Sequence, residues 1–284
     1  MKVSYYPGCS LDGTAREFGE SVEGVAKSLG VELDELPDWN CCGASSAHVT
    51  NDALAVGLAA RNLEIAEKAG MDVVVPCAMC FSRLKVAEKE LLAGRKIDGI
   101  SVELSGNLSI QNSVDFFWTN VGKQAIARKV TKSLKGLNPV CYYGCLTNRP
   151  PKITDAKRPE DPQEMDLLIG SLGAQVRNWS YKTDCCGGSL ILTLPEVAHK
   201  LIQKLLDMAL EAGADCIVAA CPMCHGNLDI WQKEISEETG KEYNIPIFYF
   251  TELMGLAFET PSVQTWLGRH HADPIPFLRE KGLL

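Results

Sequence analysis

One cysteine pattern occurs twice along the 284-residue chain and constrains the fold more than any other feature. Each copy has a Gly-Cys dipeptide, then a Cys-Cys-Gly triplet, then a Cys-x-Met-Cys motif. The second cysteine of the triplet lies 35 residues before the first cysteine of that last motif in both copies. The first set comprises Cys9, Cys41, Cys42, Cys77 and Cys80, and the second comprises Cys145, Cys185, Cys186, Cys221 and Cys224. The duplicated spacing predicts two related units.

Strand and helix patterns alternate in the same order in both copies. Strands are expected at residues 3–6 and 72–76 and, in the second copy, at 138–144 and 214–220; amphipathic helices follow them, and each half ends in a further strand and helix. Short apolar strands between helices favour parallel sheets that are covered on both faces. We therefore expect an α/β fold of two pseudo-symmetric, Rossmann-like domains, residues 1–136 and 137–284. The chain is long enough for two such cores.

The charge and hydropathy of the chain exclude some classes of function. A net charge of −8 and an isoelectric point near 5.2 argue against a nucleic-acid partner, which needs a basic surface. No apolar run approaches the roughly 20 residues that span a bilayer, so direct membrane insertion is not expected. Twelve cysteines without a secretory leader favour metal or redox chemistry in a reducing compartment, and we expect a cytoplasmic protein.

Several kinds of cysteine chemistry could use this pattern. Two Cys-x-x-Cys pairs could bind one structural zinc ion, although each pair comes with three more cysteines. A thioredoxin-like dithiol is a second alternative, because each pair lies between a predicted strand and a helix. Buried structural thiols are a third, and we assign Cys141 and Cys216 to it since each lies inside a predicted strand and has no counterpart in the other copy.

Iron–sulfur ligation agrees best with the complete pattern. The side chains of adjacent cysteines diverge, so a doublet suits a polynuclear cluster better than a single ion. Thiolates on short loops with backbone amides nearby are what such clusters need. Glycines after each doublet, Gly43 and Gly187, would allow a close approach of the backbone.

The doubled five-cysteine pattern resembles the tandem cysteine-rich "CCG" domains of the B-type subunit of heterodisulfide reductase, over nearly the whole chain. The resemblance implies that each half binds a noncubane [4Fe-4S] cluster through its five cysteines. It also implies that a disulfide, of the coenzyme M–coenzyme B type in a methanogen, is cleaved reductively between the two clusters. Anaerobic metabolism is the expected context.

The resemblance also implies partner proteins. The chain has no Gly-x-Gly-x-x-Gly nucleotide fingerprint and no ferredoxin-type cysteine run, so its electrons must come from other polypeptides. The implied partners are a small subunit with cubane [4Fe-4S] clusters and a flavin subunit, with hydrogenase or formate dehydrogenase and electron bifurcation as further options. An electron-relay subunit of a quinone-linked lactate, glycolate or glycerol-phosphate oxidoreductase is one alternative, and a non-enzymatic zinc scaffold is another.

Other side chains are candidates for roles near the cysteines. His225 follows Cys224, and His48 lies shortly after the first doublet, so either could donate a proton. Arg16, Arg149 and Lys152 could bind an anionic substrate, with a solvated surface charge as the alternative for each.

Two further segments have weaker assignments. Residues 147–164 are a proline-rich, locally basic insertion that lengthens the second copy, and we interpret them as a solvated loop or a substrate lid. The pair His270 and His271 lies in a polar C-terminal stretch and is interpreted as structural or incidental.

Overall fold

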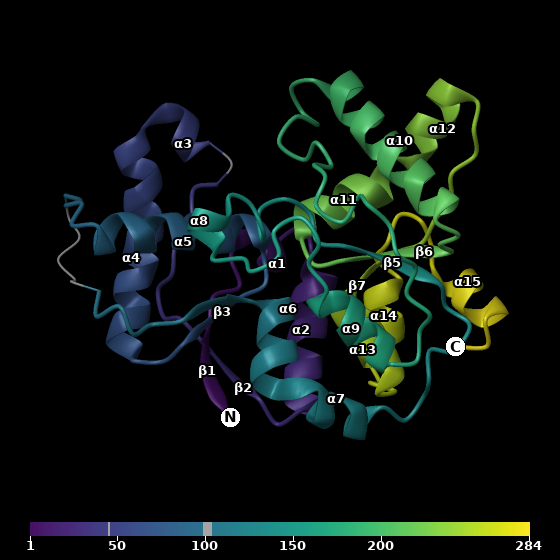
Figure 1. Ribbon diagram of the computed structural model, residues 1–284, viewed down its shortest axis with the longest axis horizontal. Helices are drawn as coiled ribbons and strands as arrows, with labels where there is room; N and C mark the ends of the chain where they lie inside the picture. The colour runs from purple at the N-terminus through teal and green to yellow at the C-terminus, as the bar shows by residue number, and fades with distance from the viewer. Residues whose placement is uncertain (45, 99–103) are drawn as a thin grey trace.

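The chain forms two parallel β-sheets with helices packed around them (Figure 1). The computed structural model describes residues 1–44, 46–98 and 104–284. The first sheet has the strand order β2-β1-β3-β4 and the second has the order β5-β6-β7, and all pairings are parallel. The predicted α/β class with helix-flanked parallel sheets is confirmed.

The elements follow one another in the alternation that the sequence predicts. Those of the first half are β1 (Lys2–Tyr5), α1 (Cys9–Asp12), α2 (Arg16–Ser28), β2 (Glu32–Glu35), α3 (Ala47–Thr50), α4 (Asp52–Ala69), β3 (Val73–Val75), α5 (Ala78–Leu92), β4 (Ile110–Asn112), α6 (Ser113–Asp115), the π-helix η1 (Phe116–Gly122) and α7 (Lys123–Lys129). Those of the second half are β5 (Pro139–Tyr142), α8 (Pro151–Thr154), α9 (Glu164–Ser171), α10 (Pro195–Glu211), β6 (Cys216–Ala219), α11 (Pro222–Ile230), α12 (Gln232–Thr239), β7 (Ile247–Tyr249), α13 (Phe250–Ala257), α14 (Val263–Leu267) and α15 (Ile275–Glu280).

Local sequence explains where the longer elements begin and end. The side chain of Asn51 accepts a hydrogen bond from the Leu54 amide (2.9 Å) and so caps the start of α4. Gly70 ends the same helix in the left-handed conformation, which glycine adopts without strain. In α2, Phe18, Val22 and other apolar residues recur every three or four positions and form one buried face.

The two sheets correspond strand by strand except at one edge. Strands β1, β3 and β4 match β5, β6 and β7, but β2 has no counterpart among the described strands of the second sheet. At that edge the chain runs beside β5 through two backbone hydrogen bonds, from the Gln175 amide to the Leu137 carbonyl (2.9 Å) and from the Arg177 amide to the Pro139 carbonyl (2.7 Å). In the second half, the chain therefore follows the course of β2 but forms only part of the strand's hydrogen bonds.

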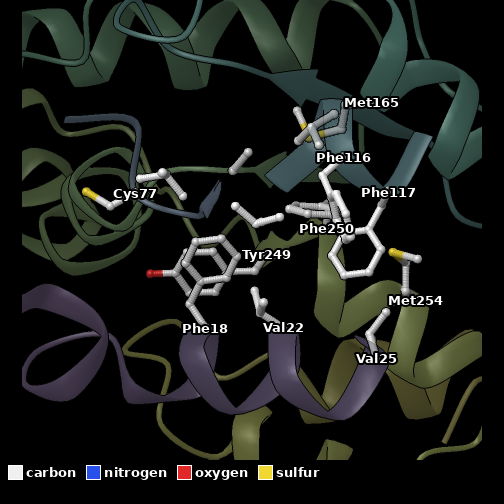
Figure 2. Packing of buried hydrophobic residues seen from close by; sticks show 14 of the residues in the cluster. Phe18, Val22, Val25, Cys77, Phe116, Phe117, Met165, Tyr249, Phe250 and Met254 are labelled. Carbon is white, nitrogen blue, oxygen red and sulfur yellow. The ribbon is translucent and has the colours of Figure 1, made fainter. Parts of the chain in front are cut away.

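The hydrophobic core joins the two halves instead of separating them (Figure 2). The ring of Phe18 in α2 stacks on that of Tyr249 at the end of β7, with centroids 4.2 Å apart. Phe117 in η1 meets Phe250 in α13 edge to face at 6.0 Å. Burying each such ring is worth roughly 2–3 kcal/mol, so the first half depends on late residues for its stability. The boundary at residues 136 and 137 stays a prediction.

Candidate metal centre

The ten patterned cysteines gather at the carboxyl ends of the strands. Cys9 opens α1 just after β1, and Cys77 directly precedes α5 after β3. In the second half, Cys145 follows β5 and Cys221 precedes α11 after β6. Open parallel sheets bind ligands at the carboxyl ends of their strands. Cys141 and Cys216 lie inside β5 and β6, fully buried and apart from this group, as expected.

Sulfur atoms lie close together in both halves. The Sγ atoms of Cys9 and Cys41 are 3.7 Å apart, and those of Cys42 and Cys80 are 3.3 Å apart. In the second half, the corresponding distance from Cys186 to Cys224 is 3.7 Å. All of these cysteines are free thiols. Each half thus brings thiols from separate segments of the chain within reach of one another.

The two sets of thiols meet at one contact between the halves. The buried thiols of Cys77 and Cys221 interact across the halves, and this interaction raises the pKa of Cys77 well above its usual range. The pKa of Cys221 is lowered by hydrogen bonds from Cys224 and Cys77. The patterned thiols of the two halves therefore form one group, called the sulfur line below.

Solvent reaches only part of this line. The side chains of Cys9, Cys41 and Cys185 are exposed, and Cys145 is half-buried, whereas the remaining patterned cysteines are buried. The centre of the arrangement is therefore buried, and the first cysteine of each doublet is exposed to solvent.

Hydrogen bonds between thiols also lower the pKa of one cysteine in each half. The hydrogen bond between the thiols of Cys42 and Cys80 lowers the pKa of Cys42 to about 7. In the second half, a hydrogen bond from Cys145 lowers the pKa of Cys185 to about 6. The Gly187 amide also donates a hydrogen bond to the Cys185 sulfur (3.3 Å), which lowers this pKa further. Thiolates are the form that binds metal, so both halves hold a sulfur that loses its proton readily.

Glycine before the first cysteine of each set is a steric requirement. A Cβ atom on Gly8 would lie 2.7 Å from the Sγ atom of Cys80, and one on Gly144 would lie 2.7 Å from that of Cys224. Both glycines also have a positive φ, near +73° and +70°. The backbone can therefore approach the buried sulfur closely only where the side chain is absent.

A matched pair of tyrosines positions the doublets. The hydroxyl of Tyr6, three residues before Cys9, donates to the carbonyl of Asn40 (2.8 Å), immediately ahead of the first doublet. Tyr142, three residues before Cys145, donates to the carbonyl of Asp184 (2.6 Å), immediately ahead of the second. These contacts tie the first strand of each half to its doublet.

The candidate histidines lie in different environments. His225 is buried at the start of α11, where its Nε2 lies 3.1 Å from the Ile247 carbonyl and its ring stacks on Tyr249 at 4.0 Å. His48 lies on the exposed helix α3. Only His225 thus has a fixed orientation beside a patterned cysteine.

The three candidate cationic side chains also lie in different surroundings. Arg149 forms an ion pair with Glu160 and donates to the Thr183 carbonyl (3.3 Å), and it acts electrostatically on Cys145. Lys152 is exposed on α8, within the insertion. Arg16 lies at the start of α2, next to a small pocket that also contains Glu20 and Glu23 and two more carboxylates. Arg149 alone of the three has a described electrostatic link to a cysteine thiol.

One ion pair was missed by the sequence analysis. His270, which the sequence analysis interprets as structural or incidental, has a completely buried side chain. Its Nε2 lies 2.9 Å from Oε1 of Glu252, and its ring packs edge to face against His225. This partner raises the pKa of His270 to about 9 although burial opposes the shift. Glu252 is 18 residues away in sequence, so no local pattern indicates the pair.

A cavity of about 580 Å³ lies between the halves beside the sulfur line. Its walls come from α5, the segment from residue 106 to α6, and the insertion at residues 147–164. No cysteine is among the described residues that line it. The insertion is mostly loop with the short helix α8, and one of its faces closes this cavity.

The donor set fits a polynuclear iron–sulfur cluster better than single zinc ions. Each half offers five thiols, one more than a tetrahedral ion accepts. The neighbouring members of each doublet turn to different partners, Cys41 to Cys9 and Cys42 to Cys80. Such divergence suits ligands of different metal atoms in one cluster.

Comparison with known proteins agrees with this geometry. The cysteine-rich domain family, CCG, matches the chain twice, at residues 3–85 and 140–229. The chain belongs to the cysteine-rich CCG domain family. Each of the two matched segments contains one complete set of five cysteines.

Two relatives match this family member over almost its full length. The 8-methylmenaquinol:fumarate reductase membrane anchor subunit of Wolinella succinogenes is 31% identical, over 96% of this chain and 97% of the relative. The B-type subunit of the ferredoxin:CoB-CoM heterodisulfide reductase of Methanosarcina mazei is 27% identical, over 98% and 96%. The resemblance to this heterodisulfide reductase subunit that the cysteine pattern predicts is confirmed.

A solved structure shares the fold of this CCG protein. A hypothetical protein from Helicobacter pylori superimposes with a TM-score of 0.70 at 11% identity, covering 96% of this chain and 52% of that one. Within the described residues, no helix of the CCG protein combines the length and the apolar character needed to cross a bilayer.

Proposed function

We propose that the chain is the catalytic iron–sulfur subunit of a disulfide reductase of the heterodisulfide reductase type, acting in the cytoplasm. In this proposal each half holds one noncubane [4Fe-4S] cluster. The ligands would be Cys9, Cys41, Cys42, Cys77 and Cys80 for the first cluster, and Cys145, Cys185, Cys186, Cys221 and Cys224 for the second.

The contact between Cys77 and Cys221 supports this proposal more than any other observation. Cleaving a disulfide takes two electrons, and two adjacent clusters would supply one electron each. Ligand sets that touch across the halves provide the proximity that such a pair requires. A relay of distant, separate centres would not need this contact.

The remaining residues of the site would position the reacting groups. Tyr6 and Tyr142 hold the doublets in place through their hydrogen bonds to the preceding carbonyls. The positive charge of Arg149 near Cys145 would attract an anionic substrate group toward the second set. His225 would fix the start of α11 by its hydrogen bond to Ile247.

Electrons would come from partner proteins. We propose a small subunit with cubane [4Fe-4S] clusters as the immediate donor, and a flavin subunit that supplies it in turn, with hydrogenase or formate dehydrogenase as further partners. The relatives named as components of heterodisulfide reductases support membership in a complex of several chains.

Anaerobic purification followed by metal and sulfide analysis tests the proposal. Two [4Fe-4S] clusters require about eight iron atoms and as many acid-labile sulfides per chain. The purified protein should also reduce a disulfide with reduced methyl viologen as electron donor. A colourless protein with bound zinc and no labile sulfide would instead indicate the zinc scaffold.

A second candidate function is electron relay in a quinone-linked oxidoreductase. The 31% identity to a relative named for 8-methylmenaquinol and fumarate favours it. The two functions differ in which small molecule exchanges electrons with the protein. Rapid reduction of the oxidised protein by a menaquinol analogue with no reaction toward any disulfide would favour the relay, and the opposite result would favour disulfide reduction.

A further inference from the structure

The cavity between the halves has the size of a small-molecule site. Its volume of about 580 Å³ falls in the range of known ligand pockets. Phe81, Ala220 and Tyr143 form part of its wall. They lie one residue after Cys80, one before Cys221 and two before Cys145, so the cavity adjoins both sulfur sets.

Most charged groups of the cavity are already paired. The amine of Lys85 contacts carboxylate oxygens of Glu88 and of Asp155, the latter at 2.9 Å. Arg158 binds the carboxylate of Glu164 at 3.2 Å. These ion pairs shape the walls, and they leave few charges that could bind a ligand.

Two charged groups and one amide are available to a ligand. Within the part of the chain that the structure describes, Lys157 forms neither a hydrogen bond nor an ion pair with another residue. Asp115 uses one carboxylate oxygen to accept a hydrogen bond from Asn112 (2.7 Å), and it also lines the cavity. The Oε1 atom of Gln111 is buried without a partner. A buried acceptor of this kind normally finds a donor.

The arrangement has a positive and a negative end. Lys157 is close enough to act electrostatically on the carboxyl of Asp115. It belongs to the insertion, which the first half lacks, so this feature is specific to one side of the cavity. An ammonium group fits beside Asp115 and Gln111, and a carboxylate fits beside Lys157.

We propose that the cavity binds the α-amino-acid head group of a small zwitterionic disulfide. Lys157 binds the carboxylate of the head group, and Asp115 with Gln111 binds its ammonium group. This assignment rests on the proposed disulfide reduction, for which it names the substrate class. The reaction is R–S–S–R plus two electrons and two protons giving two R–SH, with the electrons from the iron–sulfur donor protein.

Three small disulfides differ only in the groups that the proposal uses. Cystine has both the carboxylate and the ammonium group, cystamine lacks the carboxylate, and 3,3′-dithiodipropionate lacks the ammonium group. Calorimetric titration of the anaerobically purified, oxidised protein measures binding without turnover. Cystine should bind at least about tenfold more tightly than either analogue, because each lacks one charge-assisted contact.

Single variants locate the binding to the cavity. Lys157→Ala should weaken cystine binding about tenfold and leave cystamine binding unchanged, because cystamine has no group for the lysine. Asp115→Asn should weaken the binding of cystine and cystamine but not that of dithiodipropionate. Lys135→Ala is the matched control: this exposed lysine does not line the cavity and should not affect any of the three disulfides.

The pH dependence of binding gives an independent check. Burial raises the pKa of Asp115 to about 6; Glu164 in α9 adds to this effect, whereas Asn112 and Lys157 oppose it. Lys85, Glu88 and Asp155 face the same cavity from α5 and the insertion. Cystamine binding should therefore weaken as the pH falls through about 6, and it should lose this dependence in Asp115→Asn.

Binding and turnover separate the two proposals. Equal affinities for the three disulfides, or cystine binding that Lys157→Ala does not alter, would overturn the assignment of the cavity even if all three were reduced by viologen. Selective cystine binding without any reduction would support the cavity and contradict the proposed function.

Discussion

The two halves of the molecule have the same ligand framework but different surroundings. Each half has a glycine against a buried sulfur, a tyrosine that holds the doublet, and a strand that ends at the Cys-x-Met-Cys motif. The residue after this motif is Phe81 in the first half and His225 in the second. The comparison teaches that the cysteine framework is duplicated, whereas the groups next to it have diverged.

The divergence is clearest at two equivalent carboxylates. Asp115 occupies the third position after β4, and Glu252 occupies the third position after β7. Asp115 lies half-buried beside a cavity and, among the described residues, has no cation bound to it, whereas Glu252 is completely buried and forms an ion pair with His270. One half therefore has an acid facing a cavity where the other has an internal salt bridge.

Removing one thiol from each doublet should have the largest effect. Cys42→Ser and Cys186→Ser should each lower the iron content by about half and abolish disulfide reduction, because the proposed assignment gives each half its own cluster. Iron analysis, electron paramagnetic resonance spectra and viologen-linked turnover measure these losses. Cys216→Ser is the control, because this thiol is buried within β6, away from the sulfur line. Equal losses in all three variants would refute the ligand assignment.

Adding one methyl group next to the buried sulfur should be nearly as damaging. Gly8→Ala and Gly144→Ala each place a Cβ atom 2.7 Å from a sulfur, which no ordinary contact allows. We expect each variant to lose the iron of its own half, as measured by metal analysis.

Two other glycines separate this clash from simple backbone strain. Gly30 and Gly213 have similar positive φ values, near +72° and +74°, with nothing within 4 Å of an added Cβ. Alanine there should cost only about 1–2 kcal/mol of stability and retain the iron. If these controls also lost iron, backbone strain would explain the result instead of contact with sulfur.

The different surroundings of the two equivalent carboxylates should show in the sign of two substitutions, one at Asp115 and one at His270, the partner of Glu252. Asp115 has its pKa raised by burial from 3.8 to about 6, so ionisation destabilises the folded state above pH 6. Asp115→Asn should therefore stabilise the protein by up to roughly 3 kcal/mol above pH 6 and by little near pH 4.

Replacing His270 should have an effect of the opposite sign, in a higher pH range. Its pKa is raised from 6.5 to about 9, so the stability from its ion pair is complete below pH 6.5 and is lost as the pH rises through 9. His270→Gln should destabilise most at pH 6 and least at pH 10. Denaturant unfolding at several pH values measures both effects, and two variants that change the stability with the same sign would contradict the contrast between the halves.

Removing the tyrosine hydroxyls should have the smallest effect, and it should be equal in the two halves. Tyr6→Phe and Tyr142→Phe each delete one hydrogen bond to the carbonyl before a doublet. The expected cost is about 1 kcal/mol in unfolding free energy, with the iron retained. A clearly larger loss in one half would indicate that its doublet depends more on this support.

The sequence predicts the repeated parts of the structure well. Equal spacing places Cys77 and Cys221 at corresponding strand ends, and a proline lies next to each of them, Pro76 and Pro222. Strand patterns such as Val73–Val75 and caps such as Gly70 are local, so they can be found without knowing the partners. The same local logic correctly excludes Cys141 and Cys216 from the sulfur line.

Long-range pairings could not be predicted in this way. The stack of Phe18 on Tyr249 and the ion pair of Glu252 with His270 join residues with no shared local pattern. Asp115 looks like an ordinary helix-capping acid in the sequence, and only the folded chain places it beside a cavity. The contact between Cys77 and Cys221 likewise depends on how the two sheets meet.

The packing of α13 against α2 has a consequence for synthesis on the ribosome. The first five ligands have all left the ribosome long before Tyr249 and Phe250 are translated, yet the core beneath those ligands needs both rings. We expect the nascent first half to stay open, with Phe18 exposed, until the last helices emerge. Iron delivery to the first set would then follow chain release, so both clusters would be inserted into a finished protein.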